Sequence, residues 1–522
     1  MFEIFSILTK NFIYVLSIIY YCENNSPKFS YLIKFFLKST KKEAIAMLDL
    51  IKQKHNEPKF DELSQMLCDL KDFLDEDVDF KNKQWVENLN EILDFQDLDG
   101  SFKLFDSYKI PSDARVDFCY LPTYICTAIL MKAFMCDCDA FTIREMSALS
   151  AGLKMSCAKN LTGHGYEGLK GQIEALNIFM KAGIKEFLDF HPDISPEFTG
   201  MIEKIISSYK DKIVQSNFTG PWGESYEEDI KSVTHYFSKR SVFVYGTLMD
   251  GEANHGYLEN SDFLGTAVVE GYGMYDCGWY PAIVTGDSLV IGELYDVPLE
   301  DIPSIDMLEG EGSLYAKKCE RISLNGNSTF AYVYVYLGDV SSLERIPSWK
   351  NDHLWYLSYG SNMLEERFMC YIEGGSFEGS RYHPPCSDTT PPLAVRAVEL
   401  PYDMYFGHQS GSWQGKGVSF LDVTKSGKSL GVAYLITRKQ FEHVVLRENC
   451  GRLQDRRCGW YEDTIDLDAM DGFEVKTITN ADIREYNEPS AEYWDTLIRG
   501  IRQHWPEMSD SEIEDYLKRC IR

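Results

Sequence analysis

The hydrophobic pattern changes from helical to strand-like near Ser241, and this change constrains the fold more than any other feature of the chain. Before it, apolar residues recur three and four positions apart, as in 63–74, which is the spacing of an amphipathic helix. After it, short runs rich in β-branched and aromatic residues alternate with glycine-containing turns. We therefore predict a multidomain α+β protein, with an all-α N-terminal domain, two small mixed β-barrel domains and a C-terminal helical segment.

The positions of these runs give the domain boundaries. Expected strands lie at 242–245, 267–270, 289–295, 329–336, 354–359 and 431–437. A helical pattern returns from Ser490, and Ser509 followed by Glu512 forms a capping box that opens the last helix. The 522 residues have room for about three or four domains. We predict domains at 1–240, 241–350, 351–487 and 488–522.

Composition excludes several classes of function. The chain has 81 acidic and 52 basic residues, for a net charge of −29. Such a chain has no cationic surplus to bind nucleic acid or an anionic membrane surface, so we expect neither partner. A hydrophobic share of 44% is enough for packed cores, which excludes wholesale disorder.

Cysteine usage and the N-terminus indicate the cytoplasm. The 14 cysteines include no CxxC pair, and the ten histidines lie at no zinc-ligand spacing. We therefore expect free thiols in a reducing compartment, no metal and, in the absence of a phosphate-loop or dinucleotide motif, no cofactor. The apolar stretch 12–21 is shorter than a membrane span and lacks a signal-peptide cleavage site, so we interpret it as a buried helix.

Two segments of the chain repeat one pattern. Val244–Met249 reads VYGTLM and Ser358–Met363 reads SYGSNM, and each follows an apolar strand. The glycine allows a sharp turn and a close approach to a ligand, and the N–H groups after it can converge on an anion. The pattern therefore predicts two ligand-binding turns.

A family resemblance rests on the first turn together with later motifs. These are Asn254-His255, Tyr280-Pro-Ala, Gly292-Glu-Leu-Tyr and Asp306-Met-Leu-Glu-Gly with Tyr315, in this order. The set resembles the gamma-glutamylcyclotransferases, in the gamma-glutamylamine cyclotransferase-like branch, over 241–350. Leu357–Asn362, with Gly431–Tyr434, Glu448 and Tyr461, resembles the glutathione-side members over 354–480. The resemblance does not reach 1–240.

The resemblance implies a cofactor-free reaction that releases 5-oxoproline and a free amine or amino acid from a γ-glutamyl amide. The substrate's own α-amine attacks the γ-carbonyl, so the enzyme supplies positioning and a proton shuttle. The family's catalytic glutamate corresponds to Glu309, and counting back from Tyr315 excludes the nearby Glu311. The implied substrate-binding residues are Tyr245, Gly246, Thr247, Leu248 and Tyr315.

For the second turn, the corresponding residues are Glu448 as catalytic group and Tyr359, Gly360, Ser361, Asn362 and Tyr461 as substrate-binding residues. Tyr359 and Glu448 are 89 positions apart, against 64 for Tyr245 and Glu309. Three interpretations stay open: a second active site, a degenerate duplicate or a barrel that only binds a ligand. Aromatic and basic residues are close in sequence to this site, namely Trp413, Arg447, Arg452, Arg456, Arg457 and Trp460.

Two other functions remain possible on the sequence. One is a non-catalytic scaffold or binding protein with degenerate barrels, and the other is removal of a γ-glutamyl protecting group from an amine-bearing metabolite. Charge favours an amine, because 241–316 holds fourteen carboxylates and no Lys or Arg. We expect these carboxylates to raise the pKa of Glu309 and to favour a small-molecule γ-glutamyl substrate with a cationic amine leaving group.

Overall fold

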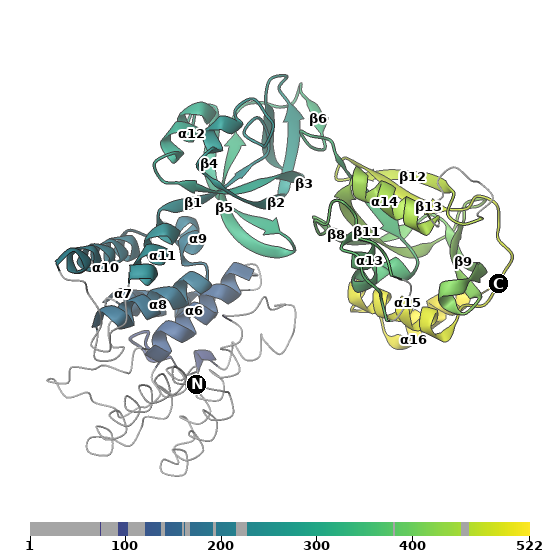
Figure 1. Ribbon diagram of the computed structural model, residues 1–522, viewed down its shortest axis with the longest axis horizontal. Helices are drawn as coiled ribbons and strands as arrows, with labels where there is room; N and C mark the ends of the chain where they lie inside the picture. The colour runs from purple at the N-terminus through teal and green to yellow at the C-terminus, as the bar shows by residue number, and fades with distance from the viewer. Residues whose placement is uncertain are drawn as a thin grey trace, which may run out of the picture. The chain divides into compact units, whose positions relative to one another are not determined.

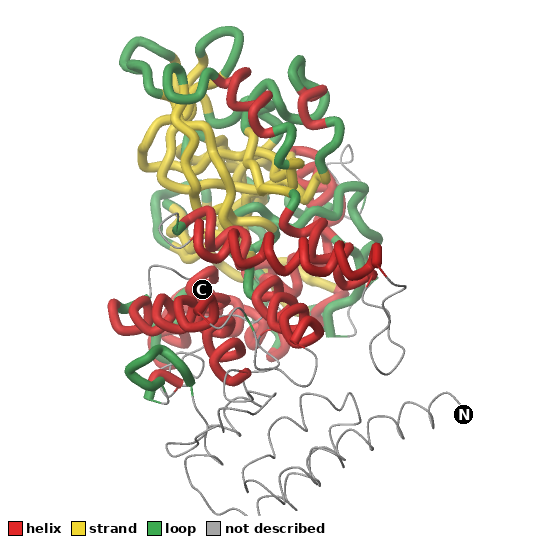
Figure 2. The backbone as a smooth tube through the Cα atoms, turned by 90° about the vertical axis from the view of Figure 1, so that its left-hand side faces the viewer, coloured by secondary structure: helices red, strands yellow, loops and turns green. Residues whose placement is uncertain are grey.

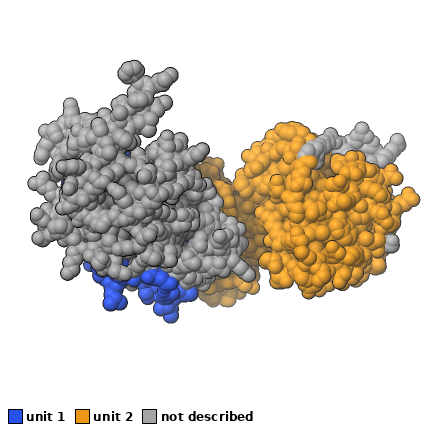
Figure 3. Space-filling model, turned by 90° about the horizontal axis from the view of Figure 1, so that it is seen from below, with its two compact units in different colours: residues 1–239 blue, residues 240–522 orange. Residues whose placement is uncertain are grey.

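The computed structural model describes residue 74 and residues 92–94, 96–102, 121–136, 141–158, 161, 168–191, 195–215, 227–378, 382–449, 451 and 459–521. The chain forms two compact units, 1–239 and 240–522, which Figure 3 colours separately. The apolar stretch 12–21 and most of 63–74 lie outside the described residues.

The described part of the first unit is helical (Figure 1). Its helices are α6 (Leu121–Cys136), α7 (Ile143–Ala158), α8 (Gly168–Lys181), α9 (Ile184–Phe190), α10 (Ser195–Gln215) and α11 (Glu227–Phe237). Helix α6 is buried on every side from Thr123 to Leu130 and contacts α7, α8 and α9. A helix that is apolar all round needs this central position, because it has no polar face to offer to water.

The second unit begins with a six-stranded sheet. Its elements are β1 (Lys239–Val244), β2 (Asp262–Asp276), β3 (Pro281–Pro298), α12 (Ile302–Glu309), β4 (Tyr315–Leu324), β5 (Asn327–Tyr336) and β6 (Glu344–Ile346). We call β1–β6 the first sheet. The strand order is β3-β1-β5-β4-β2-β6, and β2 also pairs with β3, so five of the strands form a closed ring.

Strand β1 separates two apolar clusters of the first sheet. Phe243 and Tyr245 pack among residues of β2–β5, whereas Val242 and Val244 pack with Ile305 of helix α12. Successive side chains of a strand point to opposite faces, so an unbroken apolar run is what a strand buried on both faces requires. Packing on both faces of β1 therefore fixes the position of Tyr245, the first residue after the strand.

The second sheet follows from His353. Its elements and those around it are β7 (His353–Ser358), α13 (Glu365–Ile372), β8 (Val395–Leu400), β9 (Asp403–Ser410), β10 (Lys416–Asp422), β11 (Ser429–Thr437), α14 (Arg438–Glu448), β12 (Asp463–Met470), β13 (Phe473–Thr479), α15 (Ala491–His504) and α16 (Asp510–Arg519). The strand order is β12-β13-β7-β11-β8, with β9 and β10 as a separate two-stranded ribbon. Figure 2 shows the strands in yellow and the helices in red.

The C-terminal helices share the core of the second sheet. Tyr493 and Leu497 of α15 and Leu517 of α16 belong to the same buried apolar cluster as β7 and β11. Helix α15 begins at the predicted position, with the Ser490 hydroxyl accepting from the backbone N–H of Tyr493.

Several sequence predictions are confirmed at the level of elements. The six expected strands coincide with parts of β1, β2, β3, β5, β7 and β11, and two of them, 242–245 and 354–359, extend one residue beyond the end of β1 and of β7. The Ser509–Glu512 capping box opens α16 with both of its hydrogen bonds formed. The chain is a mixed α/β protein with helices first and sheets later, as predicted. In the second sheet, the described strands form an open row and a separate ribbon, with no pairing that closes them into the predicted barrel.

Candidate functional site

The first glycine turn follows directly after β1 and is tightly held. The N–H of Met249 donates to the carbonyl of Gly246 at 3.0 Å, which closes the turn. Asn254 donates to Thr247 twice, from its backbone N–H at 2.9 Å and from its side chain at 3.0 Å. A Cβ on Gly246 would lie 2.5 Å from Cγ of Pro281, so only glycine fits here.

The backbone of this turn offers hydrogen-bond donors. The N–H groups of Thr247 and Leu248 have no acceptor among the described residues. Buried backbone N–H groups are normally paired, and adjacent unpaired ones form a site for an oxyanion or a carboxylate.

Glu309 is the last residue of α12, beside this turn. Gly310 follows in the left-handed conformation, with φ of 60°, and ends the helix there. Burial raises the pKa of the half-buried Glu309 carboxyl to about 7. The expectation that neighbouring carboxylates raise this pKa is wrong, because desolvation accounts for the shift. The nearby Asp306 instead pairs with Lys317 at 2.7 Å.

Two predicted tyrosines lie close to Glu309. The negative charge of Glu309 contributes to raising the pKa of both Tyr245 and Tyr315, although burial is the larger cause. The Tyr245 hydroxyl donates to the carbonyl of Tyr334, and the Tyr315 hydroxyl donates to the carbonyl of Pro281 at 2.8 Å. Both phenol protons are therefore used within the fold, and the two rings form walls of the site rather than proton donors.

The second turn repeats the geometry of the first. The N–H of Met363 donates to the carbonyl of Gly360 at 2.9 Å, as Met249 does to Gly246. The Tyr359 hydroxyl donates to the carbonyl of Ile478 in β13 at 2.7 Å, and Tyr245 donates to a carbonyl of β5. In each case the acceptor strand runs parallel to the strand that precedes the turn. The two turns are therefore equivalent in topology.

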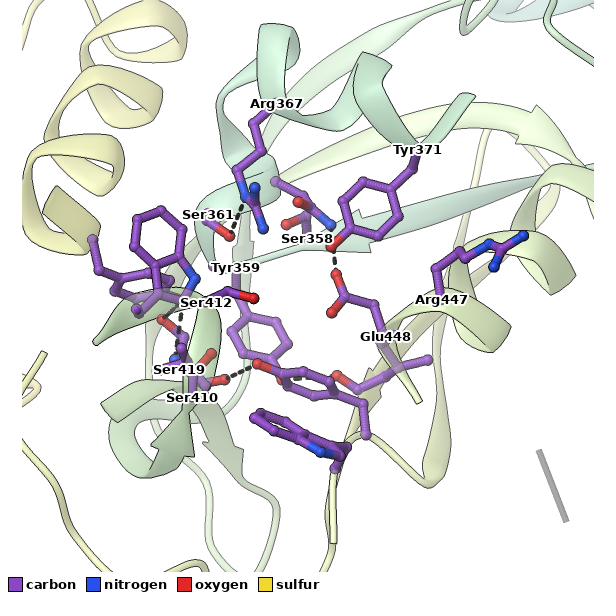
Figure 4. A pocket seen from close by; sticks show the side chains of 18 of the residues that line it. Ser358, Tyr359, Ser361, Arg367, Tyr371, Ser410, Ser412, Ser419, Arg447 and Glu448 are labelled. Carbon is purple, nitrogen blue, oxygen red and sulfur yellow. Dashed lines mark hydrogen bonds between the residues drawn. The ribbon is translucent and has the colours of Figure 1, made fainter. Parts of the chain in front are cut away.

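Glu448 has the same topological place as Glu309, at the last residue of a helix. Helix α14 starts at a capping box of Thr437 and Gln440, which the sequence analysis did not find, and it ends at Glu448. Asn362 donates to Oε1 of Glu448 at 2.9 Å, and Tyr371 forms a second side-chain hydrogen bond with this carboxyl (Figure 4). Burial raises the pKa of Glu448, and the charge of Arg367 opposes this shift.

A cavity of about 330 Å³ opens between Glu448 and the second turn. Every site residue predicted for this turn lines it: Tyr359, Gly360, Ser361, Asn362, Glu448 and Tyr461. Trp413, Arg447 and Trp460 line it as well, whereas Arg452, Arg456 and Arg457 lie outside the described residues.

Sequence reasoning missed several polar residues of this cavity, among them Arg367, Tyr371, Ser419 and Tyr493. Arg367 and Tyr371 come from α13, Ser419 from β10 and Tyr493 from α15. The sequence contained a signal for Arg367, because this residue follows the second turn by only a few positions, in the short helix α13. None existed for Tyr493, because α15 is more than a hundred residues away in sequence.

The described residues contain no group of three or more His, Cys, Asp or Glu side chains that could hold a metal ion. Within the same residues, no helix combines the length and the apolar composition that a membrane span requires.

Comparison with known proteins gives a consistent result. The family model described as gamma-glutamyl cyclotransferase, AIG2-like, matches residues 242–352. The gamma-glutamylcyclotransferase family protein YtfP of Escherichia coli is 31% identical over 20% of this chain and 91% of its own length. The gamma-L-glutamyl-butirosin B gamma-glutamyl cyclotransferase of Niallia circulans is 32% identical over 23% of this chain and 80% of its own length.

Among solved structures, YkqA from Bacillus subtilis matches 54% of this chain and 97% of its own, at 19% identity and a TM-score of 0.22. The match to the family model covers the first turn, Glu309 and Tyr315. Through residues 242–352, this chain belongs to the gamma-glutamylcyclotransferase family.

Proposed function

We propose that the protein is a γ-glutamyl cyclotransferase that releases 5-oxoproline and a free amine or amino acid from a γ-glutamyl amide. The observation that carries this proposal is Glu309, whose half-buried carboxyl has a pKa of about 7 and lies beside a turn with unpaired N–H groups. A carboxyl that titrates near the working pH can both accept and return a proton.

In the proposed reaction, Glu309 accepts a proton from the substrate's α-ammonium group. The neutral amine then attacks the γ-carbonyl carbon, so that a carbon–nitrogen bond closes the five-membered ring. The carbonyl oxygen becomes an oxyanion, which the N–H groups of Thr247 and Leu248 stabilise. When the oxyanion collapses to the lactam carbonyl and the original amide bond breaks, Glu309 returns its proton to the leaving nitrogen. The ring nitrogen loses its second proton to the released amine, which leaves as an ammonium ion, so that Glu309 is ionised again.

Glu448 has the matching role in our proposal for the second turn. Its place at the end of α14, its raised pKa and its hydrogen bond from Asn362 support an acid–base function. The competing interpretations are a degenerate duplicate and a module that only binds a ligand. The cavity beside Glu448 favours a site that accepts a small molecule in either case.

The leaving group of the first site is, in our proposal, a cationic amine. The stretch 241–316 is acidic throughout, and the first basic residue after it, Lys317, is already paired with Asp306. A relative named for its action on a γ-glutamyl derivative of butirosin B fits the related possibility of removing a protecting group from a metabolite. We place the reaction in the cytoplasm, where the free thiols of residues such as Cys126 and Cys277 stay reduced.

The decisive experiment compares Glu309→Gln with Glu311→Gln, each in a full chain that also carries Glu448→Gln so that the second site contributes no turnover, with 5-oxoproline formation as the readout. Glu311 is an exposed acid two residues away, so its variant is a matched control. We expect Glu309→Gln to lower kcat for γ-glutamyl amines at least about a hundredfold, because general acid–base catalysis contributes on that order. Glu311→Gln should keep full activity.

A non-catalytic ligand-binding or scaffold protein is the second candidate function. It needs the glycine turn but not a proton shuttle, so it predicts no oxoproline from wild type with any γ-glutamyl amine or dipeptide. Full activity in Glu309→Gln would instead show that another group transfers the proton at this site.

A further inference from the structure

The cavity of the second turn contains a buried positive charge, Arg367, which interacts electrostatically with Glu448 but forms no ion pair with it. Arg367 is only 6% exposed and forms no ion pair with an acidic side chain among the described residues. Its Nε donates to the Ser361 hydroxyl at 2.8 Å, and its guanidinium lies 5.2 Å from the ring centroid of Trp413. Its Nη1 has no hydrogen-bond partner in the part of the chain that the structure describes.

An unpaired guanidinium N–H in such a place is unfavourable. Leaving a buried donor without a hydrogen-bond acceptor costs free energy, and the cost is larger for a charged group. Arginine binds carboxylates in a planar, bidentate geometry and stacks on aromatic rings, as Arg367 does on Trp413. Arg367 therefore brings to the lining of the cavity a guanidinium group with an unpaired N–H, and such a group favours an anionic ligand.

The same cavity also holds unpaired acceptor capacity. The side-chain oxygen Oδ1 of Asn362 has no hydrogen-bond partner among the described residues, and Asn362 is 3% exposed. Its nitrogen is bound to Glu448, whose carboxyl faces the cavity in Figure 4. A donor for carboxylates and acceptors for an ammonium group thus line one space of about 330 Å³, enough for a small ligand.

We propose that this cavity binds the zwitterionic head group of an α-amino acid derivative, with its carboxylate on Arg367 and its ammonium group on Asn362 Oδ1 and Glu448. The inference rests on the proposed function in that a γ-glutamyl compound carries this head group. The proposal also distinguishes the second site from the first, because 241–316 contains no Lys or Arg that could bind a carboxylate in the way proposed for Arg367.

The test measures binding with a ligand that cannot be turned over. L-methionine sulfone has the α-amino acid head and a sulfone in place of the γ-carbonyl. Two matched probes each lack one charge of L-methionine sulfone. The first is the corresponding amine without the carboxylate, and the second is the N-acetyl derivative, which has no ammonium group. Fluorine NMR of the full chain labelled with fluorotryptophan reports on the cavity through Trp413, whose signal is assigned with Trp413→Phe.

We expect L-methionine sulfone to shift the Trp413 signal in wild type, and each one-charge probe to bind at least about tenfold more weakly. Arg367→Met should weaken binding of the sulfone by a similar factor, whereas Arg502→Met, at an exposed arginine of α15, should leave it unchanged. If circular dichroism shows that Arg367→Met does not fold, the affinities of the three probes for the wild-type protein still test the proposal.

Equal affinity for the three probes, or no response of Trp413 to the sulfone, would overturn the proposal. A folded Arg367→Met protein with wild-type affinity would overturn it too. Because the readout is binding at Trp413, these outcomes are independent of whether Glu309→Gln abolishes oxoproline formation.

Discussion

Glu309 owes its protonation behaviour to burial and not to the acidity of the surrounding chain. Fourteen carboxylates lie within 241–316, yet desolvation alone accounts for the pKa of about 7. The reason is that exposed carboxylates are screened by water, whereas removal of a carboxyl from water acts on it directly. This distinction has two measurable consequences.

The first consequence is the pH dependence of catalysis. Because Glu309 must be ionised to accept the substrate's proton, kcat/KM should rise with pH and level off above an apparent pKa of about 7. The measurement is kcat/KM for one γ-glutamyl amine between pH 5 and about pH 8 at fixed ionic strength. Glu311→Gln should keep the same profile. A kcat/KM that is nearly flat over this range, as expected for a carboxyl with the ordinary glutamate pKa of about 4.3, would contradict the assignment.

The second consequence concerns stability. The folded pKa of Glu309, about 7, lies above the unfolded value of about 4.5, so the native state holds this proton more tightly. The stabilisation of the native state that comes from this tighter proton binding is therefore fully present below pH 4.5 and is lost as the pH rises to about 7. Glutamine does not titrate, so Glu309→Gln should raise the free energy of unfolding at pH 8, relative to wild type, by about 1–3 kcal/mol more than at pH 4.

Urea unfolding of both proteins at the two pH values measures this difference. Both curves share every other titrating group, so those contributions cancel in the comparison. A stability difference that does not change with pH would mean that Glu309 is not desolvated in the native state.

Strand β1 and its turn depend on close backbone contact with β3. A Cβ on Gly292 in β3 would lie 2.3 Å from the carbonyl oxygen of Val244, the last residue of β1. The next residue, Glu293, accepts from the N–H of Asp250 at 2.7 Å and from Lys350 at 2.8 Å, which fixes the far end of the turn. The Gly-Glu pair thus sets the distance between β3 and the residues that hold the substrate in our proposal.

Gly292→Ala should therefore separate β1 from β3. We expect it to lower the free energy of unfolding by about 1–3 kcal/mol or more, as for overpacked sites, and to reduce activity with the γ-glutamyl amine. Gly256→Ala is the matched control, because a Cβ there meets nothing within 4 Å. Chemical denaturation of both variants measures the effect, and equal stabilities would show that β3 can shift at no cost.

The net charge of −29 is unevenly distributed along the chain. Residues 241–350 hold 17 acidic and 5 basic residues, and at least three of those bases form ion pairs: Lys317 with Asp306, Arg345 with Asp287 and Lys350 with Glu293. The first site therefore lies in an acidic field, whereas the second cavity is lined by Arg367 and Arg447. The two sites differ in the charge that they offer to a ligand.

This difference predicts the preferred leaving group. At low ionic strength, wild type should turn over γ-glutamyl derivatives of diamines with a kcat/KM about tenfold above that for γ-glutamyl-alanine, and added salt should reduce the ratio. Glu448→Gln is included so that turnover by the second site is removed from the comparison. Equal rates for both substrates at low salt would exclude an electrostatic preference at the first site.

Much of the architecture could be predicted from local patterns. All six expected strands, the helical start and the α16 capping box follow from periodicity and turn chemistry, which act over a few residues. The two glycine turns could be found because each needs the same short motif after a strand. The stretched spacing of Glu448 did not prevent its assignment as a candidate, since the insertion lies before α14 and the glutamate still ends a helix.

By itself, the sequence determined the elements, the two turns and the candidate glutamates, because these depend on neighbours along the chain. The tertiary structure alone decided that Arg367 is buried with no ion pair among the described residues and that Tyr493 lines the same cavity. It also decided that burial, not charge, raises the pKa of Glu309. Burial and pairing depend on residues that are distant in sequence and meet only after the strands and helices have packed.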